Sequence, residues 1–241
     1  MKYGVLGTGM VGQVIASKLV ALGHEVMMGS RARGHEKAVA WAQGAGPRAS
    51  EGSFADAAAF GARIFNCTAG VHSLAALAAA GDENLEGKIL VDLANPLDFS
   101  RGFPPTLSVG NDDSLGEQIQ RAHPRLKVVK ALNTINCLLM VDPSRVPGNH
   151  TIFVAGDDAA AKEDVLAVLG EFGWAPGQVI DGGGSPSRAG PRRTSTSGCG
   201  STGPCRRRTS TSRSRWRRGG RRASQGRRGP TLGRPGPIYM S

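Results

Sequence analysis

A glycine-rich turn near the start of the chain, Gly7-Thr8-Gly9-Met10-Val11-Gly12, constrains the fold more than any other feature of the sequence. It follows the apolar run KYGVLG, which is typical of a buried parallel strand. A helix is expected after the turn, because apolar residues recur at helical spacing before Gly23: Val11, Val14, Ile15, Leu19 and Leu22. A GxGxxG pattern between a strand and a helix predicts a βαβ unit whose turn holds phosphates.

The three glycines of this turn each have a physical role in phosphate binding. Gly7 permits the tight turn, Gly9 lets a pyrophosphate approach the backbone, and Gly12 allows the helix to pack closely on the strand. The N-terminus of the helix adds free N–H groups and the positive end of its dipole. The motif therefore predicts a dinucleotide site, and the alternative is a glycine turn without a ligand.

Residues 1–181 continue as alternating strand-like and helix-like segments. Strands are expected at residues 2–7, 24–29, 63–68, 88–95, 127–132, 151–156 and 178–181. Helices are expected at residues 10–22, 35–46, 53–60, 72–81, 113–122 and 157–172, the last with Asp157 or Asp158 as its N-cap. The alternation predicts an α/β fold, a Rossmann-type doubly wound parallel sheet at residues 1–135. A small αβ C-terminal domain is expected at residues 136–181.

The residues after the second expected strand select the cofactor. An NAD enzyme places an acid about 20 residues beyond the glycines, whereas this chain has Gly29-Ser30-Arg31-Ala32-Arg33 and no acid there. Ser30 and Arg31 can bond a 2′-phosphate, and Arg33 and Lys37 add positive charge. We therefore predict NADP(H) rather than NAD(H). The alternative is that these are solvated loop arginines.

The nicotinamide is expected across the carboxyl ends of the later strands. The residues there with small polar or exposed backbone groups are Asn66, Cys67, Thr68, Asn95, Pro96 and Asn133. For each of them a turn-forming role is the alternative. Cys67 has no base partner in the sequence, so we expect a small core residue rather than a nucleophile, and we predict no catalytic side chain. The cysteine and histidine spacings predict no metal site.

Four segments together resemble one known family: GTGMVG, the LGHEV–GSR turn, VDLANPLDFS and VVKALNT. Over residues 1–181 the chain resembles the NADP oxidoreductases that depend on coenzyme F420, a deazaflavin. The resemblance implies hydride transfer between NADPH and this deazaflavin. By position it implies NADP contacts at Thr8, Met10, Val11, Ser30, Arg31 and Lys37, and a nicotinamide side at Asn66–Ala69 and Asn95–Pro96, which adds Ala69. An imine, a quinone or a chelated metal stays open as the acceptor.

The last 60 residues differ sharply from the rest in composition. The chain carries a net charge of +11, yet residues 1–181 hold 15 Lys and Arg and all 19 Asp and Glu, a net charge of −4. Residues 182–241 hold the other 15 basic residues, all arginine, and no acid. Because 50 of these 60 residues are Arg, Gly, Ser, Thr or Pro, the tail cannot bury a core and is expected to be disordered. Such a polycation predicts non-specific, salt-sensitive binding of nucleic acid.

A change of reading frame explains the tail better than an evolved nucleic-acid arm. When each codon takes the third base of one residue and the first two of the next, residues 193–197 permit Asp-Val-Tyr-Leu and residues 208–213 permit Phe-Asn-Leu-Ala. The resembled family has similar motifs in this order after its VID segment. We therefore hypothesise a single insertion or deletion near residues 181–184, real or a sequencing error. Resequencing that finds an unbroken frame without these codons would disprove it.

The partners and location follow from the same features. We expect a small-molecule hydride acceptor, a cytoplasmic location, no membrane contact, and a homodimer only if the C-terminus were intact. The frame change would remove amphipathic helices, leave an apolar patch exposed and impair activity. Two alternatives remain open: an NADP-binding regulatory or scaffold protein without turnover, and a nucleic-acid-binding protein that uses the tail.

Overall fold

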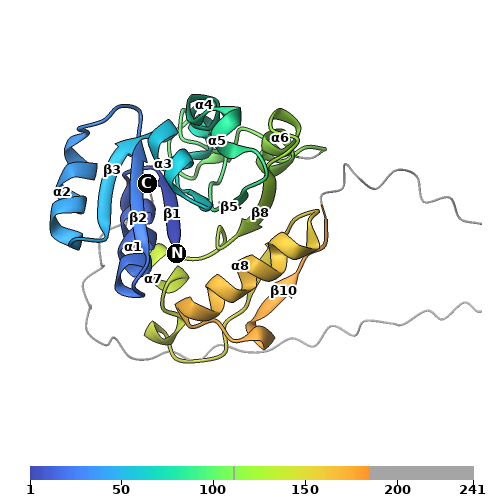
Figure 1. Cartoon of the computed structure of the whole chain (residues 1–241). Helices are drawn as coiled ribbons and strands as arrows, with labels where there is room; N and C mark the ends of the chain where they lie inside the picture. Colours follow the sequence, from blue (N-terminus) through green and yellow to red (C-terminus); the bar gives the residue numbers. More distant parts are fainter. Residues whose placement is uncertain (111, 185–241) are drawn as a thin grey trace, which may run out of the picture. The chain divides into compact units, whose positions relative to one another are not determined.

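The computed structural model describes residues 1–110 and 112–184, which are built around one eight-stranded sheet (Figure 1). The strand order is β10-β9-β8-β5-β4-β1-β2-β3. The strands are β1 (Lys2–Leu6), β2 (Glu25–Ser30), β3 (Ala49–Ser53), β4 (Arg63–Asn66), β5 (Ile89–Asp92), β8 (Lys127–Ala131), β9 (Ile152–Ala155) and β10 (Val179–Asp181). All neighbours pair in parallel except β8 and β9. The order β3-β2-β1-β4-β5-β8 confirms the predicted Rossmann-type sheet.

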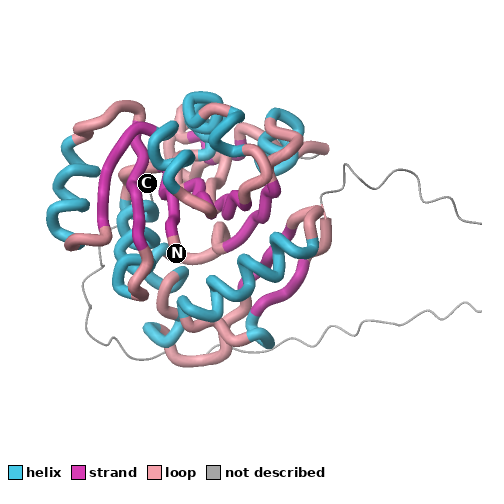
Figure 2. The backbone as a smooth tube through the Cα atoms, viewed as in Figure 1, coloured by secondary structure: helices cyan, strands magenta, loops and turns pink. Residues whose placement is uncertain are grey.

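Helices cover both faces of this sheet (Figure 2). One core lies under α1 (Met10–Ala21), α2 (Glu36–Ala45), α7 (Cys137–Met140) and α8 (Ala159–Phe172). The other lies under α3 (Phe54–Phe60), α4 (Gly70–Ala80), α5 (Asp82–Leu85) and α6 (Leu115–Ala122). Side chains alternate between the two faces of each strand, so both cores receive residues from the same strand. Tyr3 and Val5 of β1 pack in the first core, and Leu6 packs in the second.

The segment predicted as a C-terminal αβ unit continues the same sheet. β9 pairs antiparallel with β8, and β10 pairs in parallel with β9 after the crossover through α8. Asp158 is the N-cap of α8, because its side chain accepts a hydrogen bond from the N–H of Ala161. Phe172 near the end of α8 stacks on Phe65 of β4, with ring centroids 6.4 Å apart. The boundary at residue 135 remains a prediction.

Several elements were not predicted from the sequence. β3 was missed because its sequence, ASEGS, has no apolar run, as suits an edge strand in which only Gly52 is buried. The short helices α5 and α7, and the two-stranded sheet of β6 (Leu97–Asp98) and β7 (Thr106–Leu107), carry no periodic signal of their own. The same holds for the 3-10 turns η1 (Pro143–Arg145) and η2 (Pro176–Gln178).

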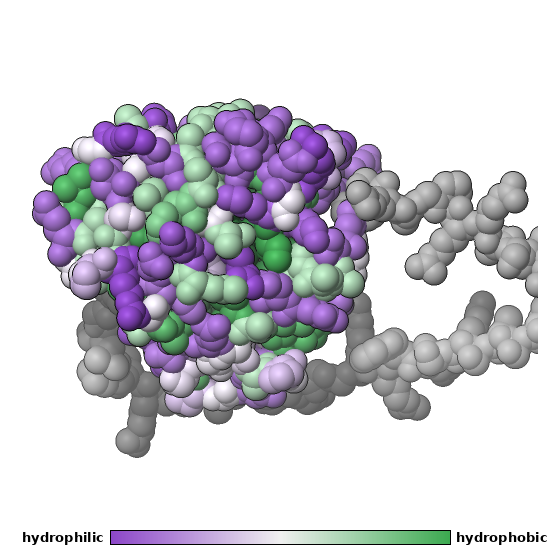
Figure 3. Space-filling model, in the orientation of Figure 1, coloured by the Kyte–Doolittle hydropathy of each residue, from purple (hydrophilic) through white to green (hydrophobic). Residues whose placement is uncertain are grey.

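Polar side chains cover much of the face seen in Figure 3, with smaller apolar areas between them. No helix among residues 1–110 and 112–184 is long and apolar enough to cross a membrane. The predicted disorder of the arginine-rich tail concerns residues that, beyond Gly184, lie outside those described.

Candidate functional site

The glycine turn between β1 and α1 is shaped by close backbone contacts. Gly7 has φ of +118° and donates its N–H to the carbonyl of Gly29 at 3.0 Å, which ties the turn to the end of β2. A Cβ on Gly12 would lie 2.1 Å from the Gly7 carbonyl oxygen. Both positions therefore require glycine because of the protein's own packing.

Gly9 differs from Gly7 and Gly12, because a Cβ placed on it meets no atom of residues 1–110 and 112–184 within 4 Å. It is the N-cap of α1, no side chain caps it, and the first turn of α1 contains no acid. Its exposed backbone leaves room for a group outside the protein, next to the N–H groups of the helix. Gln13, which was not singled out from the sequence, fixes the turn by donating from Nε2 to the Thr8 carbonyl at 3.0 Å.

Met10 and Val11 form the first turn of α1 and lie beside this open space. Met10 is 51% exposed, and Val11 is partly buried against the core. Thr8 is also partly buried. These three residues are therefore placed at the turn, as the resemblance implied, and their contacts with a nucleotide remain a prediction.

The predicted phosphate-binding residues around the loop after β2 fall into two groups, those without a partner and those already bonded within the protein. Arg31 and Lys37 are exposed and make no ion pair or hydrogen bond within residues 1–110 and 112–184. Ser30 is buried, and its hydroxyl donates to the Ala32 carbonyl at 2.5 Å, so a phosphate would have to compete for that hydrogen. Arg33 is engaged in a two-point ion pair with Asp56, in which Nε lies 2.6 Å from Oδ2 and Nη2 bonds Oδ1.

The residues predicted for the nicotinamide side gather at one edge of the sheet. β4, β5 and β8 are successive neighbours beyond β1, and their carboxyl ends lead into Asn66–Ala69, Asn95–Pro96 and Asn133. Asn95 and Asn133 bond each other reciprocally: Asn95 Nδ2 donates to the Asn133 carbonyl at 2.7 Å, and Asn133 Nδ2 donates to Asn95 Oδ1 at 3.1 Å. Leu132 before them has φ of +62°, a conformation that a non-glycine residue seldom adopts.

A buried polar network lies behind this edge, and sequence reasoning missed most of it. Asn66 has no exposed surface and donates from Nδ2 to Asp92 Oδ1 at 2.8 Å and to Ser73 Oγ at 3.0 Å. Its Oδ1 accepts from Thr68 Oγ1 at 2.7 Å. Lys130 Nζ lies 2.9 Å from Asp92 Oδ2, so the buried carboxylate is paired with a charge. The network fixes the ends of β4, β5 and β8 and the start of α4 relative to one another.

Cys67 is placed against the glycine turn and behaves as a packing residue. A Cβ on Gly7 would lie 2.7 Å from the Cys67 carbonyl oxygen, and one on Gly12 would lie 3.5 Å from Cys67 Cβ. Burial raises the pKa of the Cys67 thiol well above its usual range, so the thiol stays protonated near neutral pH. The thiol is therefore unsuited to act as a nucleophile.

A hollow of about 460 Å³ lies at the opposite edge of the sheet from the predicted site. It is lined by residues at the amino ends of β4 and β5, among them Arg63 and Lys88, and by Asp164. Among residues 1–110 and 112–184 no group of three His, Cys, Asp or Glu side chains could hold a metal ion.

Known proteins match this chain over the region that forms the site. Residues 2–96 match the family described as NADP oxidoreductase, coenzyme F420-dependent. A solved structure from Arthrobacter sp. FB24, to which F420-dependent NADP-reductase activity is ascribed, is 52% identical, with a TM-score of 0.73. The match covers 76% of this chain and 85% of that one. The chain belongs to the F420-dependent NADP oxidoreductase family.

More distant relatives share less of the chain. The rat Metalloreductase STEAP3 is 29% identical over 175 residues, and the matched region spans 73% of this chain but only 33% of that protein. The chain therefore spans about a third of the length of this curated relative. The hypothetical protein SMa0349 from Sinorhizobium meliloti is 23% identical with a TM-score of 0.63, over 76% of this chain and 85% of that one, and shows the shared fold.

Proposed function

We propose that this NADP oxidoreductase binds NADPH across the carboxyl edge of its sheet and transfers hydride between NADPH and a deazaflavin, coenzyme F420, or a related acceptor. One observation carries the proposal: the strands β1, β2, β4, β5 and β8 end at the same edge of the sheet. The open backbone at Gly9 follows β1, and Arg31, which has no partner among the described residues, follows β2. The residues predicted for the nicotinamide side follow the other three strands. A dinucleotide binds along such an edge in a Rossmann-type sheet. The acceptor rests on the relative from Arthrobacter, whose ascribed activity is F420-dependent.

The residues present fit an NADP phosphate. The space at Gly9 would take the pyrophosphate, with the uncapped N-terminus of α1 supplying N–H donors. Arg31 would pair with the 2′-phosphate; Ser30 ends β2 directly before it, and Lys37 lies in the first turn of α2. No acid follows Ser30 in the loop, so nothing on that segment favours a free ribose hydroxyl over a phosphate.

The nicotinamide side needs rigid positioning more than reactive side chains. The hydride chemistry belongs to the nucleotide when it is bound. The network through Asn66 and Asp92 holds the ends of β4 and β5 in place, and the Asn95–Asn133 pair joins β5 to β8. These residues would orient a ring against that edge and keep water away, which is the contribution that positioning makes to a direct transfer.

Mixing the purified full chain with NADPH and one acceptor at a time tests the proposal. Coenzyme F420 comes first, then an imine, a quinone and a chelated metal. We expect NADPH and the oxidised deazaflavin to be consumed in equal molar amounts, each followed by the loss of its own absorbance. Oxidation with another acceptor alone would overturn the deazaflavin assignment, and bound but unreacted NADPH would favour the regulatory alternative.

Gly9→Asp provides the matched control for this assay. The variant is expected to fold, since a Cβ at this position meets no atom of the described part of the chain and Asp is a good N-cap. Its carboxylate would nevertheless stand where the pyrophosphate binds, so turnover and NADPH binding should both be lost. Full activity in this variant would contradict the placement of the pyrophosphate.

A further inference from the structure

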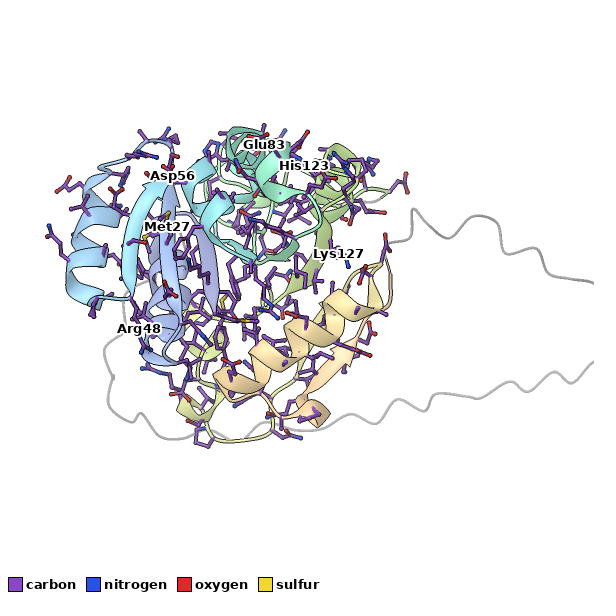
Figure 4. All side chains as sticks on the ribbon, in the orientation of Figure 1. Met27, Arg48, Asp56, Glu83, His123 and Lys127 are labelled. Carbon is purple, nitrogen blue, oxygen red and sulfur yellow. The ribbon has the colours of Figure 1, made fainter. Side chains whose placement is uncertain are left out.

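The side chain of Asp56 stands beside the loop that selects the cofactor. Asp56 is in the first turn of α3, directly after β3, and Ser30 at the end of β2 pairs in register with Ser53 at the end of β3 (Figure 4). The chain therefore places a carboxylate next to the end of β2, although the loop after Ser30 contains no acid. A free carboxylate there would repel a 2′-phosphate and would accept hydrogen bonds from ribose hydroxyls.

In this structure the carboxylate is fully engaged by protein donors. Ser53 donates to Asp56 Oδ2 from its hydroxyl at 2.6 Å and from its backbone N–H at 2.9 Å. Arg33 bonds both oxygens of the same carboxylate through its guanidinium. The Arg33 and Ser53 donors hold the pKa of Asp56 well below its usual range, so the group is charged and matched by Arg33 near neutral pH.

A second carboxylate fixes the same loop to β3. Glu51 Oε2 accepts a hydrogen bond from the backbone N–H of Gly34 at 3.0 Å. With Arg33 and Gly34 both held by β3 and α3, Arg31 is the loop arginine that remains without a partner among the described residues. The two arginines therefore differ in role although they stand two positions apart in one basic sequence.

We propose that Arg33 is a specificity residue that acts through Asp56: it masks the carboxylate, so that Arg31 meets the 2′-phosphate without an opposing charge. This inference rests on the proposed NADP-binding site. It deepens that proposal because it assigns phosphate binding to Arg31 and removes Arg33 from direct contact. The selectivity of the site then depends on an acid that the loop sequence does not contain.

A double-mutant cycle on the full chain tests the coupling. NADPH and NADH affinities are measured at low ionic strength for the wild type, Arg33→Ala, Asp56→Asn and the double variant. We expect Arg33→Ala to weaken NADPH binding by roughly fivefold, a size typical of charges exposed to solvent, and to leave the affinity for NADH unchanged. Asp56→Asn should restore NADPH binding in the Arg33→Ala background and change it little in the wild type.

Two further variants and a folding control separate the outcomes. Arg33→Lys keeps the charge and should keep the selectivity. Arg121→Ala breaks a similar exposed pair, with Asp113 at 2.8 and 2.9 Å beside α6, and should leave both affinities unchanged. In Asp56→Asn the side-chain oxygen can still accept the backbone N–H of Ser53, the N-cap of α3, and thermal unfolding of every variant identifies one that misfolds. Equal effects of Asp56→Asn in both backgrounds would overturn the masking role, whereas a wild type that binds no NADPH would overturn the proposed function itself.

Discussion

At the residue scale, the site depends on its glycines, which have no side chain, as much as on the side chains around them. Gly7 and Gly12 are required by contacts within the protein, whereas Gly9 faces open space. The strand–turn–helix context predicted the tight turn at Gly7 and the close packing at Gly12 that the structure has, whereas the pyrophosphate at Gly9 stays a prediction. The sequence could not predict the Arg33–Asp56 pair, because the partners are 23 positions apart and meet only once β2 and β3 are paired.

Replacing glycines by alanine separates packing from helix propensity. Gly12→Ala should destabilise the chain and abolish nucleotide binding, because the new Cβ would lie 2.1 Å from the Gly7 carbonyl oxygen. Gly44→Ala is the control: Gly44 lies in α2, and no atom of the described residues lies within 4 Å of the new Cβ, so the variant should be more stable by about 0.5–1 kcal/mol. Urea unfolding measures both. A Gly12→Ala variant as stable as the wild type would contradict the packing described for the turn.

At the element scale, the strands with apolar runs were predictable, and the connections between them were not. β1, β2, β4, β5, β8, β9 and β10 were all expected close to their observed places, since apolar residues cluster in each of them. β3 has polar residues and was missed. The Asn66–Asp92–Lys130 network gave no sequence signal either, because each residue comes from a different strand and only the sheet order brings the three together.

Removing the charge of Asp92 should loosen these strand ends. Asp92→Asn leaves Lys130 without its partner, and we expect a loss of about 2 kcal/mol in the free energy of unfolding. This is less than for a fully buried pair, because Lys130 can reach water. Asp113→Asn in the exposed pair with Arg121 should change stability little. Denaturation by urea gives both values. An Asp92→Asn variant with nearly the wild-type free energy of unfolding would show that the network does not hold the edge together.

At the scale of the whole molecule, the chain joins a well-formed nucleotide domain to a tail of a different character. The frame-change hypothesis predicts an exposed apolar patch, and Phe153 and Ile180 are register neighbours on β9 and β10 that are 50% and 49% exposed. The hypothesis itself concerns residues beyond those described. Every residue assigned to the nucleotide precedes Gly184, so we expect NADPH binding to be independent of the tail.

Titration of the full chain with NADPH and with NADH, alongside Arg31→Ala, tests the central claim most directly. We expect NADPH to bind more tightly than NADH in the wild type. The Arg31→Ala variant should lose roughly tenfold or more of its NADPH affinity and none of its NADH affinity, since one charge-assisted bond to the 2′-phosphate is removed. Equal affinity for the two nucleotides, or an unchanged preference in Arg31→Ala, would contradict the account.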